Sequence, residues 1–325
     1  MTDYRSPLLH LPGAVAGNGI DAPVAAHYGS FHGEQRTLDQ GEGFVDLSHR
    51  GVVRVSGPDR LGWLHSLTTP SFEGLAPRTP VAALVLSPQG HVEHAMYGVD
   101  DGDAFTAHVE PGQAEPLRAW LDSMRFMMRV EVADVTDEVA VTWRPSARRD
   151  GAPYSGYELV RRGELATYAA AAGPACGLWA FEALRIARGE PRLGLDTDER
   201  TIPNEAGWIN TAVHLDKGCY RGQETVARVH TLGRPPRRLT LLHLDGSDNR
   251  LPERGSALTV SGGTTDRAVG FVGTSARHHE LGPIALGMVK RNVPLDATLE
   301  VDGITAAQEV IVDPEVGLHV RPQLR

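Results

Sequence analysis

The stretch KGCYRGQE, residues 217–224, holds the side chains best suited to covalent or redox chemistry. Of the chain's two cysteines, Cys219 lies here, two positions after Lys217. A nearby cation or a helix N-terminus favours a thiolate, which can act as a nucleophile, a soft metal ligand or a redox-sensitive group. The next residues predict a helix over 222–233, ended by Gly233 and Pro235. We therefore predict a partly activated thiol at Cys219 with Lys217 as its cation; the alternative is a glycine-rich turn whose cysteine only packs.

Three further residues of this region need separate explanations. Gln223 and Glu224 fall in the first turn of the predicted helix, where their side-chain oxygens can satisfy free N–H groups. Cys176, in GPACGLWAF, is expected to be a buried inert thiol. A disulfide between the two cysteines is the less expected arrangement in a chain without an export signal.

Composition excludes several classes of function. The formal net charge is −9 and basic residues form no long run, which argues against a nucleic-acid partner. No apolar run approaches the roughly 18–20 residues of a membrane helix, and the N-terminus lacks a leader pattern. We expect a cytoplasmic protein without a membrane partner. No phosphate-loop, dinucleotide or metal-binding motif is present, so no metal site is predicted.

The elements that must position the thiol are short strands and helices that interleave without a strict βαβ repeat, which predicts the α+β class. Residues 44–56 predict a strand pair, and Asp59 suits the N-terminus of a helix over 59–67. Residues 1–40 are expected to form a tail or wrapping segment. The α+β region spans 41–235, with two subdomains divided near the loop at 145–153. From 236 to 325, turn-bounded segments predict a small β-barrel.

KGCYRGQE, followed by TVARVHTLG and PPRRLTLL, resembles the signature of the YgfZ family of folate-binding proteins, which support iron–sulfur cluster assembly or repair. FVDLSHRGVVRVSGPDRLGWLHSL and EALRIARGEPRLGLDTDERTIPNEAGW extend the resemblance to roughly residues 25–320. That family is similar in fold to the T-protein, the aminomethyltransferase of the glycine cleavage system. The resemblance implies a ferredoxin-like α+β region with a tetrahydrofolate site, followed by a C-terminal β-barrel.

The resemblance also implies roles for individual residues. Glu205 matches the Pro-x-Glu element that supplies a carboxylate to the pterin, and a carboxylate can accept two hydrogen bonds from an aminopyrimidine edge. Tyr157 falls on an aromatic strand near the ligand, although a strand tyrosine can equally be core. Arg238, with Arg234 and Arg237, is expected at the folate tail, or else at a barrel edge. Gln223 and Glu224 complete the predicted folate-binding set, and Cys219 and Lys217 are the predicted reactive residues.

The chain departs from the T-protein where that enzyme carries a pair of aspartates. The matching segment is GHVEHA, residues 90–95, with His94 and Ala95 at the position of the pair. Aminomethyl transfer needs a carboxylate near the folate nitrogen, and Glu93 can provide it only if strand alternation turns it inward. The next acidic residues, Asp100 and Asp101, fall in a predicted hairpin turn.

These observations favour an accessory protein that binds tetrahydrofolate or a one-carbon-substituted folate. Its partners would be client iron–sulfur proteins or the assembly machinery. The alternatives are a folate-dependent aminomethyltransferase or demethylase of the T-protein type, and a non-catalytic folate sensor or scaffold. Whether the chain turns over a substrate is left open by the sequence.

Overall fold

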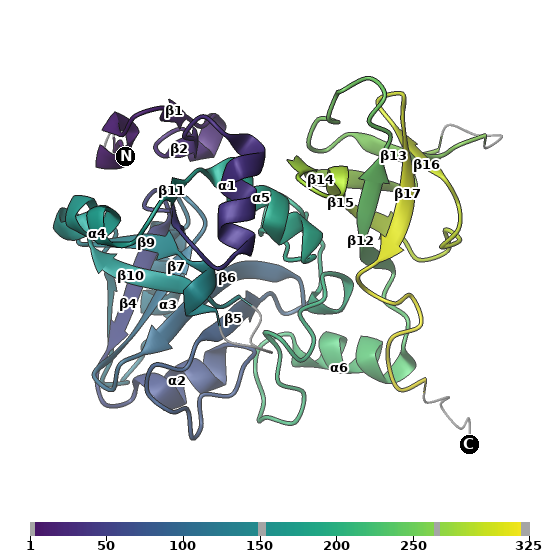
Figure 1. The fold of residues 1–325 in the computed structure, drawn as a ribbon. Coiled ribbons are helices and arrows are strands. Elements are labelled where there is room, and N and C mark those ends of the chain that lie inside the picture. The colour runs from purple at the N-terminus through teal and green to yellow at the C-terminus, as the bar shows by residue number, and fades with distance from the viewer. Residues whose placement is uncertain (1–3, 149–153, 263–266, 320–325) are drawn as a thin grey trace, which may run out of the picture. The chain divides into compact units, whose positions relative to one another are not determined.

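A computed structural model describes residues 4–148, 154–262 and 267–319 (Figure 1). Contacts divide the chain into two compact units, which are Met1–Leu84 with His94–Glu182 (unit 1) and Val85–Glu93 with Ala183–Arg325 (unit 2). Most of the predicted boundary loop at 145–153 lies outside the described residues, which resume at Tyr154. None of the helices in the described ranges has both the length and the apolar composition needed to cross a bilayer.

A five-stranded sheet forms the centre of unit 1, with strand order β5-β6-β7-β4-β8. Its strands are β4 (Gly51–Ser56), β5 (Val81–Leu86), β6 (Val92–Asp100), β7 (Ala104–Val109) and β8 (Glu131–Asp134). β4 pairs antiparallel with both β7 and β8. Helix α2 (Arg60–Leu67) contacts β7, and α3 (Ala114–Ser123) contacts β4 and β8. The order of β4, α2, β6, β7, α3 and β8 along the chain and in the sheet is the predicted ferredoxin-like arrangement.

Two details of this region differ from the sequence-based expectation. Strand β7 was not predicted, although residues 105–109 alternate between apolar and polar types; all six of its residues, polar ones included, are buried. Asp59 occupies the N-cap position of α2 but makes no side-chain cap bond. Its carboxylate instead accepts hydrogen bonds from the backbone and guanidinium of Arg129, at 2.6–3.0 Å.

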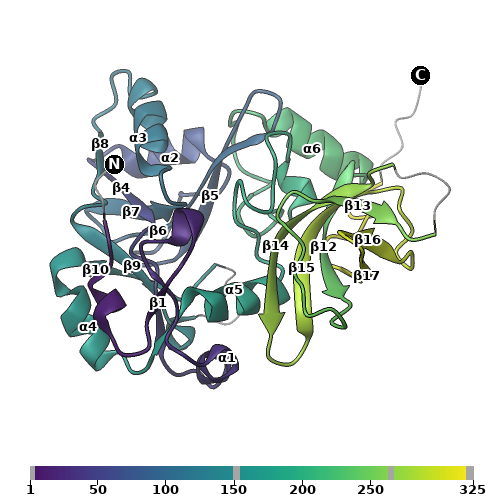
Figure 2. The same cartoon turned by 90° about the horizontal axis from the view of Figure 1, so that it is seen from above.

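A second, four-stranded sheet in unit 1 has the order β10-β9-β3-β11. Figure 2 labels two of its strands, β9 and β10. Its strands are β3 (Phe44–Asp46), β9 (Val139–Trp143), β10 (Tyr157–Arg161) and β11 (Ala175–Cys176). The strand pair predicted over 44–56 is therefore wrong in its pairing, although both strands exist. β3 pairs with β9 and β11, while β4 belongs to the five-stranded sheet.

The first forty residues contain the helices η1 (Pro7–His10), η2 (Gly19–Asp21) and α1 (Phe31–Asp39) and the strands β1 (Val15–Ala16) and β2 (Ala25–His27). Side-chain hydrogen bonds attach this segment to β3 and the turn after it. Tyr4 donates to Ser48 Oγ at 2.7 Å, and Ser6 donates to Asp46. The remaining helices of unit 1 are η3 (Pro145–Ala147), η4 (Arg162–Glu164), α4 (Leu165–Ala171) and the first half of α5 (Leu178–Ala187).

Unit 2 contains the predicted barrel, a closed sheet with strand order β12-β15-β14-β13-β16-β17. Its strands are β12 (Arg237–Leu244), β13 (Ala257–Val260), β14 (Gly270–His278), β15 (Gly282–Lys290), β16 (Leu299–Val301) and β17 (Ile304–Val310). β17 closes the barrel by pairing with β12. Apolar side chains such as Leu242, Leu258 and Val289 fill its interior. Helices η5 (Pro203–Glu205) and α6 (Gln223–Leu232) precede it.

Candidate functional site

The predicted thiol lies in a tight turn of unit 2, residues 217–222, which we call the thiol turn. Cys219 is exposed, while the neighbouring Tyr220 is buried. Gln223 closes the turn, since its Oε1 accepts from Tyr220 N at 3.3 Å and its Nε2 donates to Lys217 O at 3.4 Å. The Lys217 ammonium lies 5.1 Å from the centre of the Tyr220 ring, a cation–π distance. Gln223 thus fixes the backbone on both sides of a surface thiol.

Helix α6 begins at Gln223, with Gly222 as its N-cap in the left-handed conformation. Cys219 therefore precedes the first helical residue by four positions. The field of a helix terminus falls off within about one turn, so Lys217 is the nearer source of positive charge in sequence. Glu224 is exposed and pairs with Arg228 one turn along the helix, at 2.8 Å. The predicted folate contacts of Gln223 and Glu224 stay predictions.

The thiol turn rests directly on the turn between β5 and β6. A Cβ atom on Gly222 would lie 2.5 Å from Ser87 O and 3.0 Å from Gly90 Cα. A Cβ on Gly90 would lie 2.8 Å from Thr225 Cβ. An ion pair between Arg221 and Glu93, at 3.0 Å, spans the same junction. The glycines allow two backbone turns to meet where side chains would separate them.

The side chains at and after this junction show whether a carboxylate takes the place of the T-protein aspartates. Glu93 does not turn inward: its side chain is 38% exposed and its carboxylate binds Arg221. His94 is half-buried, with its ring 6.4 Å from that of Trp120, and Ala95 is buried. Asp100 accepts two hydrogen bonds from Arg60, at 2.7 and 2.9 Å. Asp101 caps the β6–β7 hairpin. None of the carboxylates in residues 90–101 is both buried and unpaired.

Glu205, the predicted pterin carboxylate, is buried and bound to Arg237. Its two oxygens accept from Arg237 Nε and Nη2, each at 2.9 Å, and Oε2 also accepts from Ile202 N at 3.1 Å. Arg237 further binds Asp198 at 2.6 and 2.9 Å. Burial tends to raise the pKa of the Asp198 carboxyl, but hydrogen bonds from Arg237 and Thr201 outweigh it and lower the pKa to about 2. The first residue of β12 thereby holds the segment 198–205.

Arg238 points the other way, because side chains alternate along a strand. It is fully buried and donates to Lys290 O at 3.0 Å, Val293 O at 3.1 Å and Gln308 Oε1 at 2.8 Å. These bonds attach β12 to the loop after β15 and to β17. The predicted contact of Arg238 with a folate tail stays a prediction, and Arg237 is the member of the arginine group that meets carboxylates.

Tyr157 belongs to a cluster of aromatic rings in unit 1. Its ring centre lies 4.3 Å from that of His108 and 6.3 Å from that of Tyr97, and Tyr97 lies 4.8 Å from Tyr154. The guanidinium carbon of Arg50 lies 5.4 Å from the centre of the Tyr157 ring. The sequence analysis missed Arg50, Tyr97 and His108. Arg50 lies in a turn without periodicity, and His108 in the strand that was not predicted.

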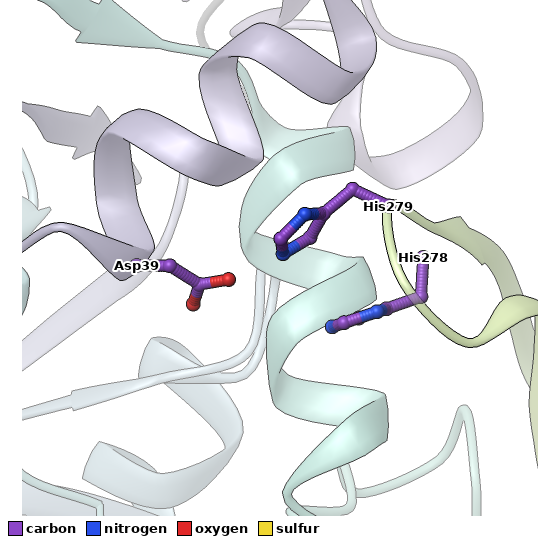
Figure 3. A group of neighbouring side chains, drawn as sticks. All are labelled: Asp39, His278 and His279. Atoms are coloured by element: carbon purple, nitrogen blue, oxygen red, sulfur yellow. The ribbon is translucent and has the colours of Figure 1, made fainter.

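His278 is the last residue of strand β14 in unit 2, and His279 follows it (Figure 3). The ring centres of His278 and His279 lie 4.8 Å apart. His278 Nδ1 accepts from the backbone N–H groups of Glu280 and Leu281, both at 3.2 Å, which closes the β14–β15 turn. Asp39, also drawn there, belongs to unit 1. The prediction that the chain has no metal site stays a prediction.

Comparison with known proteins gives several relatives of low identity. No family model matches the chain. It is 27% identical over 306 residues to a putative chloroplastic transferase of Arabidopsis thaliana, covering 81% of this chain and 69% of that protein. It is 26% identical over 232 residues to the aminomethyltransferase of Nitrosococcus oceani, covering 58% of this chain and 62% of that enzyme.

An iron–sulfur cluster assembly factor is also among the relatives. The chain is 25% identical over 217 residues to the mitochondrial iron–sulfur cluster assembly factor IBA57 homolog of Mycosarcoma maydis, covering 58% of this chain and 53% of that factor. The predicted resemblance to the YgfZ and T-protein group is confirmed. The aminomethyltransferase T of Bartonella henselae has the same fold, with a TM-score of 0.75 at 17% identity over 95% of this chain and 97% of that structure.

The close contact at Gly222 predicts that Gly222→Ala destabilises the protein by more than about 1 kcal/mol. The left-handed backbone alone accounts for about 1 kcal/mol, and the clash of the new Cβ with Ser87 O adds to it. Chemical denaturation measures the loss. The matched control is Gly218→Ala, because nothing lies within 4 Å of a Cβ at Gly218. Equal stability of the two variants would contradict the close contact.

The two cysteines are expected to differ sharply in alkylation. Cys219 is exposed, whereas burial and the nearby Glu34 raise the pKa of the buried Cys176 thiol to about 12. The folded, reduced protein should take up a single iodoacetamide label at neutral pH, located by mass spectrometry at Cys219. Cys219→Ala should abolish rapid labelling and Cys176→Ala should preserve it. Rapid labelling of Cys176 would show that its burial is wrong.

The lowered pKa of Asp198 predicts that this residue contributes to the free energy of unfolding in a pH-dependent way. Its pKa is lowered from 3.8 to about 2 on folding, so its stabilising effect is present above pH 4 and is lost as the pH falls through 2. Asp198→Asn should therefore lower the urea midpoint at pH 7, and the difference from wild type should shrink between pH 4 and pH 2. The exposed neighbour Glu199 provides the control, Glu199→Gln. A difference that does not change with pH would refute the ion pair with Arg237.

Proposed function

We propose that the chain is a tetrahydrofolate-binding accessory protein for the assembly or repair of iron–sulfur clusters in client enzymes. The observation that carries this proposal is the thiol turn, in which an exposed Cys219 sits on a backbone fixed by Gln223 and by the Gly222–Gly90 contact. A rigid turn that keeps a thiol at the surface can present it to another protein. The similarity to an iron–sulfur cluster assembly factor supports the same function.

The residues around the exposed Cys219 are suited to contact with another protein rather than to catalysis in a closed active site. Lys217 precedes the thiol by two positions, and its ammonium is placed near the buried Tyr220 ring. Arg221 and Glu224 use their charges in ion pairs with Glu93 and Arg228. We propose that Lys217 stabilises negative charge that develops on the thiol when a client binds, and that the client or the assembly machinery is the partner of this surface.

The folate part of the proposal is supported by the fold and by the aromatic cluster of unit 1. The fold is that of an aminomethyltransferase, and relatives include enzymes of that name. Tyr157, Tyr97 and Tyr154 provide flat apolar faces against which a pterin ring can stack. When bound, tetrahydrofolate would supply a one-carbon carrier, and these tyrosines would orient its ring. The predicted contact of Glu205 with a pterin stays a prediction, since its carboxylate is bound to Arg237 in unit 2.

The aminomethyltransferase alternative is less well supported by the geometry. At the position of the T-protein aspartates the chain has His94 and Ala95, and Glu93 is held at the surface by Arg221. No step of aminomethyl transfer can be assigned to a carboxylate there. A folate sensor or scaffold needs only the ligand site and predicts no role for Cys219. The predicted cytoplasmic location stays a prediction.

The test combines ligand binding with complementation. Calorimetric titration of the reduced protein with tetrahydrofolate under anaerobic conditions should show saturable binding at a single site. In cells that lack this protein, the wild type and Cys176→Ala should restore the activity of iron–sulfur enzymes, whereas Cys219→Ala should bind folate but fail to restore activity.

Each half of the proposal can fail separately. Full restoration by a folded Cys219→Ala variant would remove the thiol from the function and leave the sensor or scaffold. Absence of folate binding would remove the ligand and leave a thiol protein that acts through partners. Release of a methylene group from an aminomethyl donor, dependent on folate, would restore the aminomethyltransferase alternative.

A further inference from the structure

Arg50 and His108 form a buried polar pair in unit 1. Arg50 is 2% exposed and His108 is 1% exposed. Arg50 directly precedes β4, and His108 lies opposite Val52 in the β4–β7 register. The Arg50 Nη1 and His108 Nδ1 atoms lie 3.3 Å apart. The carboxylate of Glu110 pairs with the guanidinium only at a distance, since its Oε1 lies 3.8 Å from Arg50 Nη2, beyond hydrogen-bond length.

The contact fixes the tautomer of His108. A guanidinium can only donate, so Nδ1 of the imidazole must accept and its proton must lie on Nε2. Burial, with the positive charge of Arg50, lowers the pKa of His108 well below its ordinary value, which keeps the ring neutral at pH 7. Both residues therefore present N–H groups in fixed directions.

One donor on each residue has no partner. Arg50 Nε and His108 Nε2 are buried, and neither donates a hydrogen bond to an acceptor in the described part of the chain. Buried polar groups in folded proteins are almost always satisfied, so two neighbouring unsatisfied donors indicate that something else supplies the acceptor. The charge of Arg50 favours an acceptor with negative charge or a strong dipole.

The surroundings restrict the shape of that ligand. His108 is 4.3 Å from the ring of Tyr157 and 5.4 Å from that of Tyr97. The Arg50 guanidinium carbon lies 5.4 Å from Tyr157 and 5.8 Å from Phe181, measured to the ring centres. Tyr154, which stacks on Tyr97, is a non-glycine residue at φ 56°, a strained conformation that is common at ligand sites. Flat rings around two donors suit a planar heteroaromatic ligand.

We propose that Arg50 and His108 determine ligand specificity by donating hydrogen bonds to an acceptor oxygen of a planar heteroaromatic ligand that stacks on Tyr157 and Tyr97. The identity of the ligand rests on the proposed function. In a folate, the acceptor is either the 4-oxo group of the pterin or a carboxylate of the glutamate tail. A site whose buried donors require an acceptor rejects analogues that lack one.

The test is a calorimetric comparison of three ligands: tetrahydrofolate, its 4-amino-4-deoxy analogue, and tetrahydropterin without the tail. The variant Arg50→Met keeps the length of the side chain and removes its donors. Arg54→Met, on the strand that Arg50 precedes, is the matched control, since the Arg54 side chain is 38% exposed and pairs with Glu138 only at 3.6 Å. His108→Gln keeps a donor, and His108→Leu removes it.

Arg50→Met should weaken tetrahydrofolate binding by about 10- to 100-fold, while Arg54→Met leaves it unchanged. His108→Gln should retain more affinity than His108→Leu. If the 4-oxo group is the acceptor, the 4-amino analogue should bind wild type at least about tenfold more weakly than tetrahydrofolate, and Arg50→Met should erase the difference. If a tail carboxylate is the acceptor, only ligands with the tail should depend on Arg50.

Tetrahydrofolate binding by Arg50→Met as tight as by Arg54→Met would overturn the inference and leave the proposed function intact. If Arg50→Met does not fold, equal affinity of wild type for all three ligands would overturn it instead. Failure of wild type to bind any of them would overturn the folate function together with this inference, a pattern distinct from the other two.

Discussion

The candidate site depends on one steric constraint, the contact of two backbone turns at Gly222 and Gly90. Neither glycine can carry a side chain without meeting atoms closer than 3 Å. Because Gly222 is also the N-cap of α6, the contact sets where the helix begins and where the preceding turn must bend. The surface position of Cys219 and the ion pair of Arg221 with Glu93 both follow from that bend.

A second set of constraints comes from alternation along the first residues of β12. Arg237 and Arg238 are adjacent in sequence but face opposite sides of the strand. One neutralises the carboxylates of Asp198 and Glu205, and the other satisfies carbonyl groups inside the barrel. Both arginines are therefore used in structure, and the carboxylate that resembles a pterin ligand is already paired. Within the described residues of unit 1, Arg50 and His108 also keep buried donors without acceptors, as Arg238 does at Nε.

Much of the fold could be predicted from sequence because its elements are short and strongly patterned. The helix over 222–233 was confirmed, with Gly233 in the left-handed C-cap conformation, and so was the barrel. The pairing of β3 and β4 could not be predicted, because consecutive strands usually pair and here the turn at residues 47–50 sends them to different sheets. Strand β7 was missed although residues 105–109 alternate between apolar and polar types, and its burial on both faces, polar side chains included, could not be read from that pattern.

In the closed barrel, the register of the strands does not depend on the length of the loops that connect them. Closure leaves no free strand edge among β12–β17, so the order of pairing does not depend on how the chain travels between them. The connection from 245 to 256 is mostly exposed. Lengthening such a loop costs little free energy, because loop entropy grows only slowly with length. The barrel can therefore accept inserted sequence, and gain new surface, while its strands and the arginines at the start of β12 stay in place.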